Sequence, residues 1–249
     1  MDPLPAGAVI LQVLPRLEAG GVERGTVEMV QAIVAAGGVA LVASAGGRLV
    51  TAVERAGGRH ITLPLAAKGP WAIWRNAGRL SRVIRAEGVR VVHARSRAPA
   101  WSALRAARWC GVAFVTTYHG VYREGPGPLS GGKRWYNSVM ARGDRVIAIS
   151  RWVANHLVAR HGTDVARVRL VPRGVDPGVF DPARVPADRI TRLIRAWRLP
   201  DDAPVVMLPA RLTRWKGQTV LLRAMALVRD RRAVCVLLGD GRPGFAEEL

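Results

Sequence analysis

The sequence of 249 residues has few cysteines, few acidic residues and no long apolar run. Its two cysteines, Cys110 and Cys235, cannot make a disulfide framework, so we expect a reducing compartment. No uninterrupted apolar stretch is long enough to span a bilayer, and no basic stretch followed by an apolar core opens the chain. These absences predict a cytoplasmic protein without a signal peptide.

Lysine is also scarce, and positive charge dominates. The chain has 38 Lys and Arg against 18 Asp and Glu, a net charge of +20, and Lys68, Lys133 and Lys216 are its only lysines. A basic surface attracts nucleic acid, anionic lipid or phosphorylated ligands. A GC-rich genome would explain arginine in place of lysine, but it leaves the low number of acidic residues unexplained.

Several common binding motifs are missing. The glycines after the first predicted strand do not form G-x-G-x-x-G, which argues against the usual dinucleotide fold, and a G-x-x-x-x-G-K-[ST] loop is absent. The histidines lack metal-ligand spacing. Because the arginines are scattered, with no zinc-finger or RNA-binding motif, a basic nucleic-acid-binding protein is the less favoured alternative and we expect no nucleic-acid partner.

Strands and helices alternate along the chain. A continuous apolar run predicts a buried strand at residues 8–14, and the same signal recurs at 39–43. Further strands are predicted at residues 59–63, 89–93, 113–118, 145–149 and 167–171. Helical patterns lie between them, at residues 22–36, 49–56, 71–86, 99–109 and 150–160, with Ser150 as an N-cap for the last. This order predicts a parallel sheet covered by helices on both faces, with ligands at the carboxyl ends of the strands.

The pattern restarts after residues 172–182, which are rich in Pro, Gly and Asp and are typical of a linker. A short helix at 190–197 precedes strands at 205–208 and 234–238, with a helix at 218–229 between them. Two strands and one complete helix cannot bury both faces of a sheet. We therefore expect the second domain to be incomplete within this chain.

Two segments of the first half are candidates for ligand binding. Gly20 and Gly21 lie between the first strand and the first helix, where backbone can approach a ligand and free N–H groups attract phosphate. A tight turn is the alternative. His119 follows the strand at 113–118, where it would face a cleft, or it caps a loop through hydrogen bonds.

Two cations of the second half follow a strand and precede a helix. Arg211 and Lys216 are placed to clamp a pyrophosphate, since a guanidinium offers a planar fork and an ammonium a point charge. Solvated side chains in a basic protein are the alternative. Gly239 and Gly241 follow the next predicted strand.

Taken in order, these segments resemble glycosyltransferase family 4, whose members have the GT-B fold of two facing Rossmann-like domains. The resemblance covers the whole chain and rests on residues 20–24 (GGVER), 119–120 (HG), 146–150 (VIAIS), 171–176 (VPRGVD) with Phe180, 211–217 and 239–241 (GDG). It implies an α/β, GT-B protein with parallel sheets in two Rossmann-like domains, the second one truncated. Residues 1–182 would form the acceptor-side domain, and residues 183–249 the start of the nucleotide-sugar-binding domain.

The resemblance also implies an activity. The protein would be a retaining, hexosyltransferase-type enzyme that moves a sugar from a nucleotide-sugar to a glycolipid or saccharide acceptor, without a metal or another cofactor. The implied catalytic residues are His119, which would contact the donor sugar, and Arg211 and Lys216, which would stabilise the leaving diphosphate. The implied donor-binding set is Gly20, Gly21, Arg211, Lys216, Gly239 and Gly241.

One departure from the family pattern keeps other interpretations open. The family's second domain carries two glutamates, eight positions apart, that touch the donor sugar and the ribose. Glu247 and Glu248 lie too early and too close together to replace them. A truncated non-catalytic remnant and one half of a split enzyme are therefore alternatives to a complete transferase.

The helix predicted at residues 71–86 is amphipathic. Ile73, Ala77, Leu80 and Ile84 share one face, whereas Arg75, Arg79, Arg82 and Arg85 share the other, flanked by Trp71 and Trp74. An ordinary covering helix with a solvated basic face explains this pattern. Because many members of the family glycosylate lipid-linked acceptors at the inner face of the bacterial membrane, we expect peripheral binding of an anionic membrane and an acceptor such as lipopolysaccharide.

Overall fold

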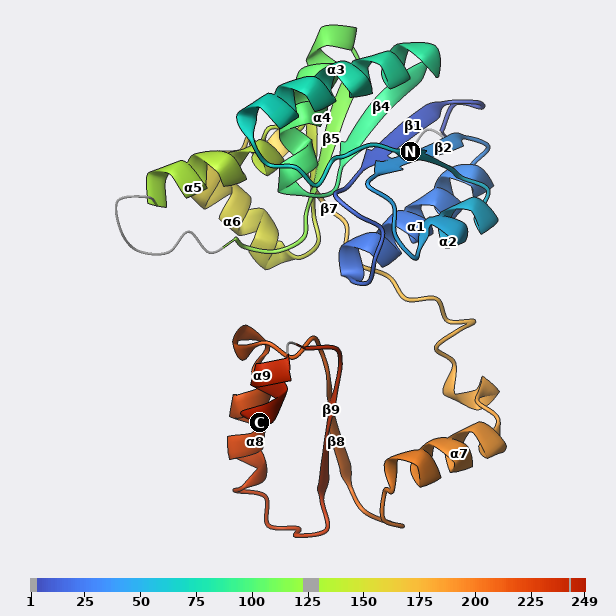
Figure 1. Cartoon of the computed structure of the whole chain (residues 1–249), viewed down its shortest axis with the longest axis vertical. Helices are drawn as coiled ribbons and strands as arrows, with labels where there is room; N and C mark the ends of the chain where they lie inside the picture. Colours follow the sequence, from blue (N-terminus) through green and yellow to red (C-terminus); the bar gives the residue numbers. More distant parts are fainter. Residues whose placement is uncertain (1–3, 123–129, 242) are drawn as a thin grey trace. The chain divides into compact units, whose positions relative to one another are not determined.

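The computed structural model describes residues 4–122, 130–241 and 243–249. The chain divides into two compact units, residues 1–174 and residues 175–249. We call them the N-terminal unit and the C-terminal unit and describe each by itself (Figure 1).

The N-terminal unit is built on a seven-stranded sheet in which all pairings are parallel. The strand order is β3-β2-β1-β4-β5-β6-β7. The strands are β1 (Val9–Val13), β2 (Val39–Ser44), β3 (Arg59–Thr62), β4 (Val89–Ala94), β5 (Ala113–Tyr118), β6 (Arg145–Ala148) and β7 (Val168–Leu170). All seven predicted strands are confirmed; β1 and β2 are apolar along most of their length, as expected for strands covered on both faces, whereas the edge strands β3 and β7 are partly exposed.

Helices cover both faces of this sheet (Figure 1). Helices α1 (Gly21–Ala35) and α2 (Val50–Arg55) pack on one face around buried side chains such as Val30 and Val53. On the opposite face, α3 (Pro70–Ala86), α4 (Arg97–Cys110) and α6 (Arg151–His161) enclose a larger core. Leu11 of β1 and Leu80 of α3 are fully buried in it.

The direction in which strands are added reverses between β1 and β4. From β1 the sheet runs through β2 to β3 on one side and from β4 to β7 on the other. In such sheets the ligand crevice lies outside the carboxyl ends of the two strands that flank the reversal. The chain leaves β1 toward Gly20 and leaves β4 at Arg95, so these segments border the crevice.

Helix boundaries differ from prediction where proline or glycine is present. Helix α4 begins at Arg97, two residues early, because a proline such as Pro99 is tolerated in the first turn of a helix. Helix α5 (Ser130–Asn137) was not predicted, since its Gly-Gly pair disfavours a helix. The N-cap at Ser150 is confirmed: its hydroxyl oxygen accepts a hydrogen bond from the backbone N–H of Val153 at 3.2 Å.

The C-terminal unit contains a two-stranded parallel sheet of β8 (Val205–Pro209) and β9 (Val234–Leu238). Its helices are α7 (Ala187–Trp197), α8 (Gln218–Met225) and α9 (Pro243–Glu247). Helix α8 ends four residues before the prediction, and α9 was not predicted. Among the residues that the structure describes in this unit, no apolar side chain is fully buried, and Gln218 is the one buried polar side chain.

Single turns of 3-10 helix complete the chain: η1 (Ser138–Ala141), η2 (Val165–Arg167), η3 (Pro182–Arg184) and η4 (Arg214–Lys216). Across the described ranges, every helix is too short or too polar to cross a membrane.

Candidate functional site

The first part of the site is the start of α1. Gly20 has a φ of +147°, a conformation that favours glycine, and no side chain of the described residues caps the helix. The carboxylate of Glu23, in the first turn, lies close to Gly20, and binding of an anion by the first N–H groups of α1 stays a prediction. The carbonyl oxygen of Gly21 accepts a hydrogen bond from Arg173 Nη1 at 2.6 Å.

Arg173, which follows β7, lies against α1. A side chain at Gly25 would overlap its guanidinium, so glycine at this position lets Arg173 approach the helix. Arg173 Nη2 also pairs with Glu28 Oε2 at 2.9 Å. These contacts hold a cation beside the crevice.

Arg95 follows β4 directly and is only 4% exposed. Its Nη1 donates to Gln12 Oε1 at 3.1 Å, and Gln12 Nε2 donates in turn to the Thr26 carbonyl at 3.1 Å. Its buried Nε has no hydrogen-bond partner among the described residues. Burial, followed by the positive charge of Arg173, lowers the pKa of Arg95 to about 10, so the side chain stays cationic near neutral pH.

His119 follows β5, at the same edge of the sheet. Its Nε2 is buried and lacks a partner within the described part of the chain. Burial, and then the charges of Arg95 and Arg173, lower the pKa of His119 to about 3. The imidazole is therefore neutral near neutral pH. His93 lies deeper, with Nε2 at 2.7 Å from Thr117 Oγ1, and burial lowers its pKa well below the ordinary value.

Together these residues form a site suited to an anion. Arg95 and Arg173 supply positive charge, and Glu28, which pairs with Arg173, is the carboxylate that opposes the lowering of the pKa of Arg95. A buried donor without a partner is costly, and a phosphate or carboxylate oxygen would satisfy the Nε of Arg95. Sequence analysis missed Arg95. Its position directly after the strand at the reversal point was the available signal.

The second part of the site lies in the C-terminal unit, where the loops after β8 and β9 meet. A hollow of about 590 Å³ is lined by residues that include Arg211, Asp240 and Gly241. The loops are joined by hydrogen bonds from Ala210 N to Leu238 O at 2.8 Å and from Leu212 N to Asp240 O at 2.9 Å. Arg211 and Gly241 are thus brought together.

Gly239 is required by this close approach. A side chain there would overlap the carbonyl oxygen of Ala210, and its φ of +156° is unfavourable for other residues. The predicted glycines Gly239 and Gly241 therefore have a structural role in shaping the hollow, whatever they bind.

Lys216 does not line the hollow. It ends η4, and its Nζ lies 4.3 Å from the centre of the Trp215 ring. Gln218, two residues after Lys216, donates its Nε2 to the Arg211 carbonyl at 2.9 Å. Glu248, which could not supply the missing glutamate pair, forms an ion pair with Arg214 at 2.6 Å.

The predicted residues thus fall into two sets. Gly20, Gly21 and His119 border the crevice of the N-terminal unit, linked through Arg173. Arg211, Gly239 and Gly241 shape the hollow of the C-terminal unit, with Lys216 nearby. In the ranges that the structure describes, no three His, Cys, Asp or Glu side chains gather as a metal site. The catalytic and donor-binding roles of these residues stay predictions.

Comparison with known proteins places this geometry in a family. Residues 19–179 match Glycosyltransferase Family 4. A D-inositol 3-phosphate glycosyltransferase of Xylanimonas cellulosilytica is 34% identical over 157 residues, which cover 59% of this chain and 37% of that protein.

Solved structures agree. A glycosyltransferase from Rickettsia africae ESF-5 superposes with a TM-score of 0.82 and 35% identity, over 97% of this chain and 63% of that one. Anabaena Alr3699/HepE, solved in complex with UDP-glucose, has a TM-score of 0.77 at 17% identity, over 96% of this chain and 64% of that one. The chain thus spans less than two thirds of these proteins. The predicted α/β class with GT-B relatives is confirmed, and the chain belongs to glycosyltransferase family 4.

Proposed function

We propose that this chain belongs to an enzyme that transfers a hexose from a nucleotide-sugar to a glycolipid or saccharide acceptor, with retention of configuration. The cationic edge of the N-terminal unit carries the proposal. Arg95 and His119 present buried nitrogens without partners, beside Arg173 and the uncapped start of α1. Positive charge fixed where a diphosphate leaves is commonly the largest catalytic contribution.

The hollow of the C-terminal unit supports a donor site. Arg211 is exposed toward it, and the free N–H groups at the start of α8 follow Lys216 directly. We propose that Arg211 and Lys216 bind the donor diphosphate, with Gly239 and Gly241 allowing close approach. Alr3699/HepE was solved with UDP-glucose, so a uridine nucleotide is the first donor to try.

The acceptor that we propose is an envelope glycolipid, such as lipopolysaccharide, at the inner face of the plasma membrane. The amphipathic prediction for α3 is confirmed at six of its eight positions: Ala77, Leu80 and Ile84 are buried and Arg75, Arg82 and Arg85 are exposed, whereas Ile73 and Arg79 are half-buried. Each basic residue near an anionic surface contributes roughly 1 kcal/mol of attraction. This face makes peripheral binding the expected way of reaching such an acceptor.

Calorimetric binding of UDP and UDP-glucose to the chain tests the donor site. We use binding because we expect sugar transfer by this chain alone to be poor. Arg211→Ala should weaken binding at least tenfold, since a charge-assisted contact contributes about 1.5–3 kcal/mol. Arg232→Ala removes an exposed arginine that is paired with Asp230 and serves as the matched control. Equal affinities for the two variants would refute the role of Arg211.

A second candidate is a protein that keeps the fold and binds an acceptor or a partner without transfer. Strand β8 favours it, since Val205, Val206 and Met207 are all exposed. Robust transferase activity of the purified monomeric chain would exclude this candidate.

A further inference from the structure

A cavity of about 620 Å³ opens on the N-terminal unit, between α3, α4 and α5. Aromatic and aliphatic side chains line most of it, namely Ile73, Trp101, Leu104, Trp109, Trp135 and Tyr136. The remaining lining includes the cations Lys68, Arg105 and Arg108. Its volume is within the usual range of small-molecule sites, about 300–1,000 Å³.

The walls of this cavity are held in place by contacts among the residues that line it. The rings of Trp101 and Trp135 stack with their centres 4.4 Å apart, and Trp101 Nε1 donates to the Tyr136 carbonyl at 3.1 Å. These contacts join α4 to α5. The apolar space between them therefore does not depend on a ligand to keep its shape.

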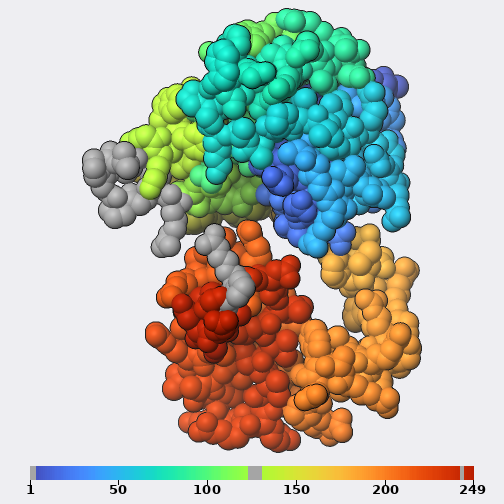
Figure 2. All heavy atoms as spheres, in the orientation of Figure 1, coloured from blue at the N-terminus to red at the C-terminus, as the bar shows by residue number. Residues whose placement is uncertain are grey.

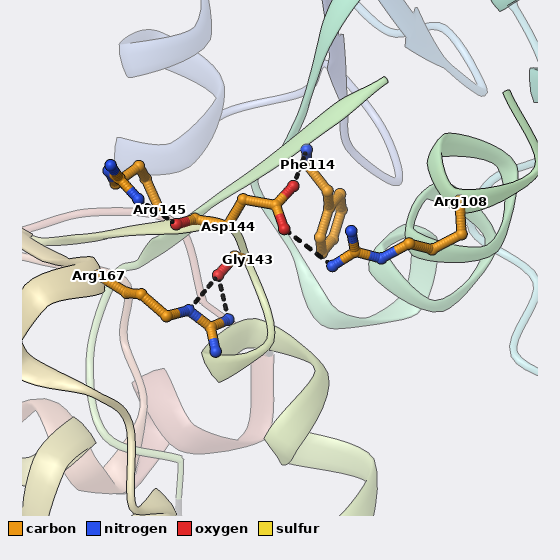
Figure 3. Close-up of polar contacts among 6 residues, drawn as sticks. All are labelled: Arg108, Phe114, Gly143, Asp144, Arg145 and Arg167. Atoms are coloured by element: carbon orange, nitrogen blue, oxygen red, sulfur yellow. Dashed lines mark hydrogen bonds and ion pairs between the residues drawn. The ribbon is translucent and has the colours of Figure 1, made fainter. Parts of the chain in front are cut away.

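Arg108 is fixed from the other side (Figure 3). Its Nη2 lies 2.8 Å from Asp144 Oδ1, while Asp144 Oδ2 accepts the Phe114 N–H at 2.8 Å. Burial alone would raise the pKa of Asp144, but these two hydrogen bonds lower it below the ordinary value. The Asp144 carboxylate thus pairs with Arg108 and does not neutralise Lys68 or Arg105.

The helices around the cavity carry charge of one sign. Helices α3, α4 and α5 contain nine Arg and Lys residues and no Asp or Glu. Neither Lys68 nor Arg105 forms an ion pair with any carboxylate that the structure describes. A ligand that places an apolar body in this cavity should therefore carry its polar end as an anion.

A second hollow continues this surface along α3, which lies at the surface of the unit in Figure 2. It is lined by Trp74 and by arginines of α3, and Trp109 lines both hollows. Trp71, which is 67% exposed, stacks on Trp74 at 5.1 Å. Exposed tryptophans among arginines are typical of protein surfaces that bind the interface of an anionic bilayer.

We propose that the cavity takes a hydrocarbon chain of an anionic membrane lipid, whose phosphate lies against Lys68 and Arg105. The inference that the lipid comes from a membrane rests on the proposed function. Binding of such a ligand in the cavity does not depend on sugar transfer. An open cavity lined by apolar side chains, with two cations that pair with no described carboxylate, fits such a ligand. A bare phosphate would leave the aromatic lining unused.

Monomeric alkyl phosphates, used below their micelle concentration, test the cavity in the full chain. Binding is followed by calorimetry and by tryptophan fluorescence. Affinity should rise roughly fourfold for each methylene from octyl to decyl phosphate. Inorganic phosphate and decanol should each bind far more weakly. No gain of decyl phosphate over inorganic phosphate would overturn the proposal.

Two variants probe the two ends of the ligand. Trp135→Ala should weaken the binding of decyl phosphate at least tenfold, because it removes a wall of the cavity. The double variant Lys68→Gln, Arg105→Gln should weaken it about tenfold by removing charge-assisted contacts at the rim, without touching the core. Trp152→Ala is the matched control, since Trp152 is 65% exposed on α6 and does not line the cavity. Wild-type affinity in the double variant would contradict the assignment of the phosphate.

Vesicles test the membrane source. Co-sedimentation with phosphatidylglycerol vesicles should exceed that with phosphatidylcholine and should fall in Trp135→Ala but not in Trp152→Ala. Equal sedimentation of these two variants would refute lipid uptake by the cavity. If the unmodified chain binds decyl phosphate but not UDP, the proposed transferase function alone is overturned. If it binds UDP but not decyl phosphate, the lipid site alone is overturned.

Discussion

The two units of this protein use the same strand and helix pattern with different results. In the N-terminal unit, seven parallel strands and helices on both faces bury side chains such as Leu11, Leu80 and Leu157 completely. In the C-terminal unit, β8 and β9 pair in the same parallel way, yet none of the described apolar side chains is fully buried.

This difference shows that a strand's sequence does not determine its burial. Val234 to Leu238 are as apolar as the residues of β1, but two strands have too few neighbours to be covered on both faces. Small units hide a smaller fraction of their surface. The stability of the chain should therefore reside in the N-terminal unit.

The largest expected effect separates the two units directly. Leu11→Ala should reduce the free energy of unfolding by about 2–5 kcal/mol, since it leaves a cavity at a fully buried position. Leu227→Ala, at a position that is 85% exposed in the C-terminal unit, should change it by less than about 0.5 kcal/mol. Urea unfolding of both variants checks this, and similar losses would show that the C-terminal unit has a core of its own.

A second prediction contrasts binding with stability at Arg95. Arg95→Met removes a buried cation but leaves Gln12 Oε1 without its donor, so the free energy of unfolding should fall by no more than about 1–3 kcal/mol. Binding of UDP-glucose should fall tenfold or more if Arg95 meets a phosphate, with a loss of about 1.5–3 kcal/mol. Thermal unfolding and calorimetry measure the two effects. A destabilised variant with unchanged affinity would make Arg95 a structural residue.

A third prediction concerns association of the exposed strands. We expect the chain to self-associate through β8 and β9, because uncovered apolar strands pair with other chains. Val206→Lys should reduce this association, whereas Arg232→Lys keeps the charge and serves as its control. Sedimentation velocity over a range of protein concentrations measures it, and a monomeric wild type would contradict the prediction.

The smallest effect is expected at Asp144. Its pKa is lowered in the folded state, so its contribution to stability is present above the unfolded pKa of about 4 and is lost as the pH falls through the folded pKa. The side chain is 39% exposed, so solvent screens its pair with Arg108. Asp144→Asn should cost about 1 kcal/mol at neutral pH. Unfolding at pH values on both sides of 4 should show the difference between wild type and variant shrinking in acid.

Much of the fold could be predicted from local patterns. Apolar periodicity and capping chemistry, which act over a few residues, predict the nine strands seen in the described residues, the N-cap at Ser150 and the buried face of α3. Gly20 has a positive φ angle at the turn where close backbone approach was expected. Helix α5 was missed because its stability depends on packing with α4, to which its own composition gives no clue.

The sequence by itself determined the α/β class, the order of the strands along the chain and the residue types that follow the strands. Only the tertiary structure decided that Arg95, His119 and Arg173 share one crevice, although they are far apart in the chain. It also decided that Trp101, Trp109 and Trp135 leave an apolar cavity among cations. Both depend on which strands become neighbours and which helices meet, and such long-range contacts carry no local signal.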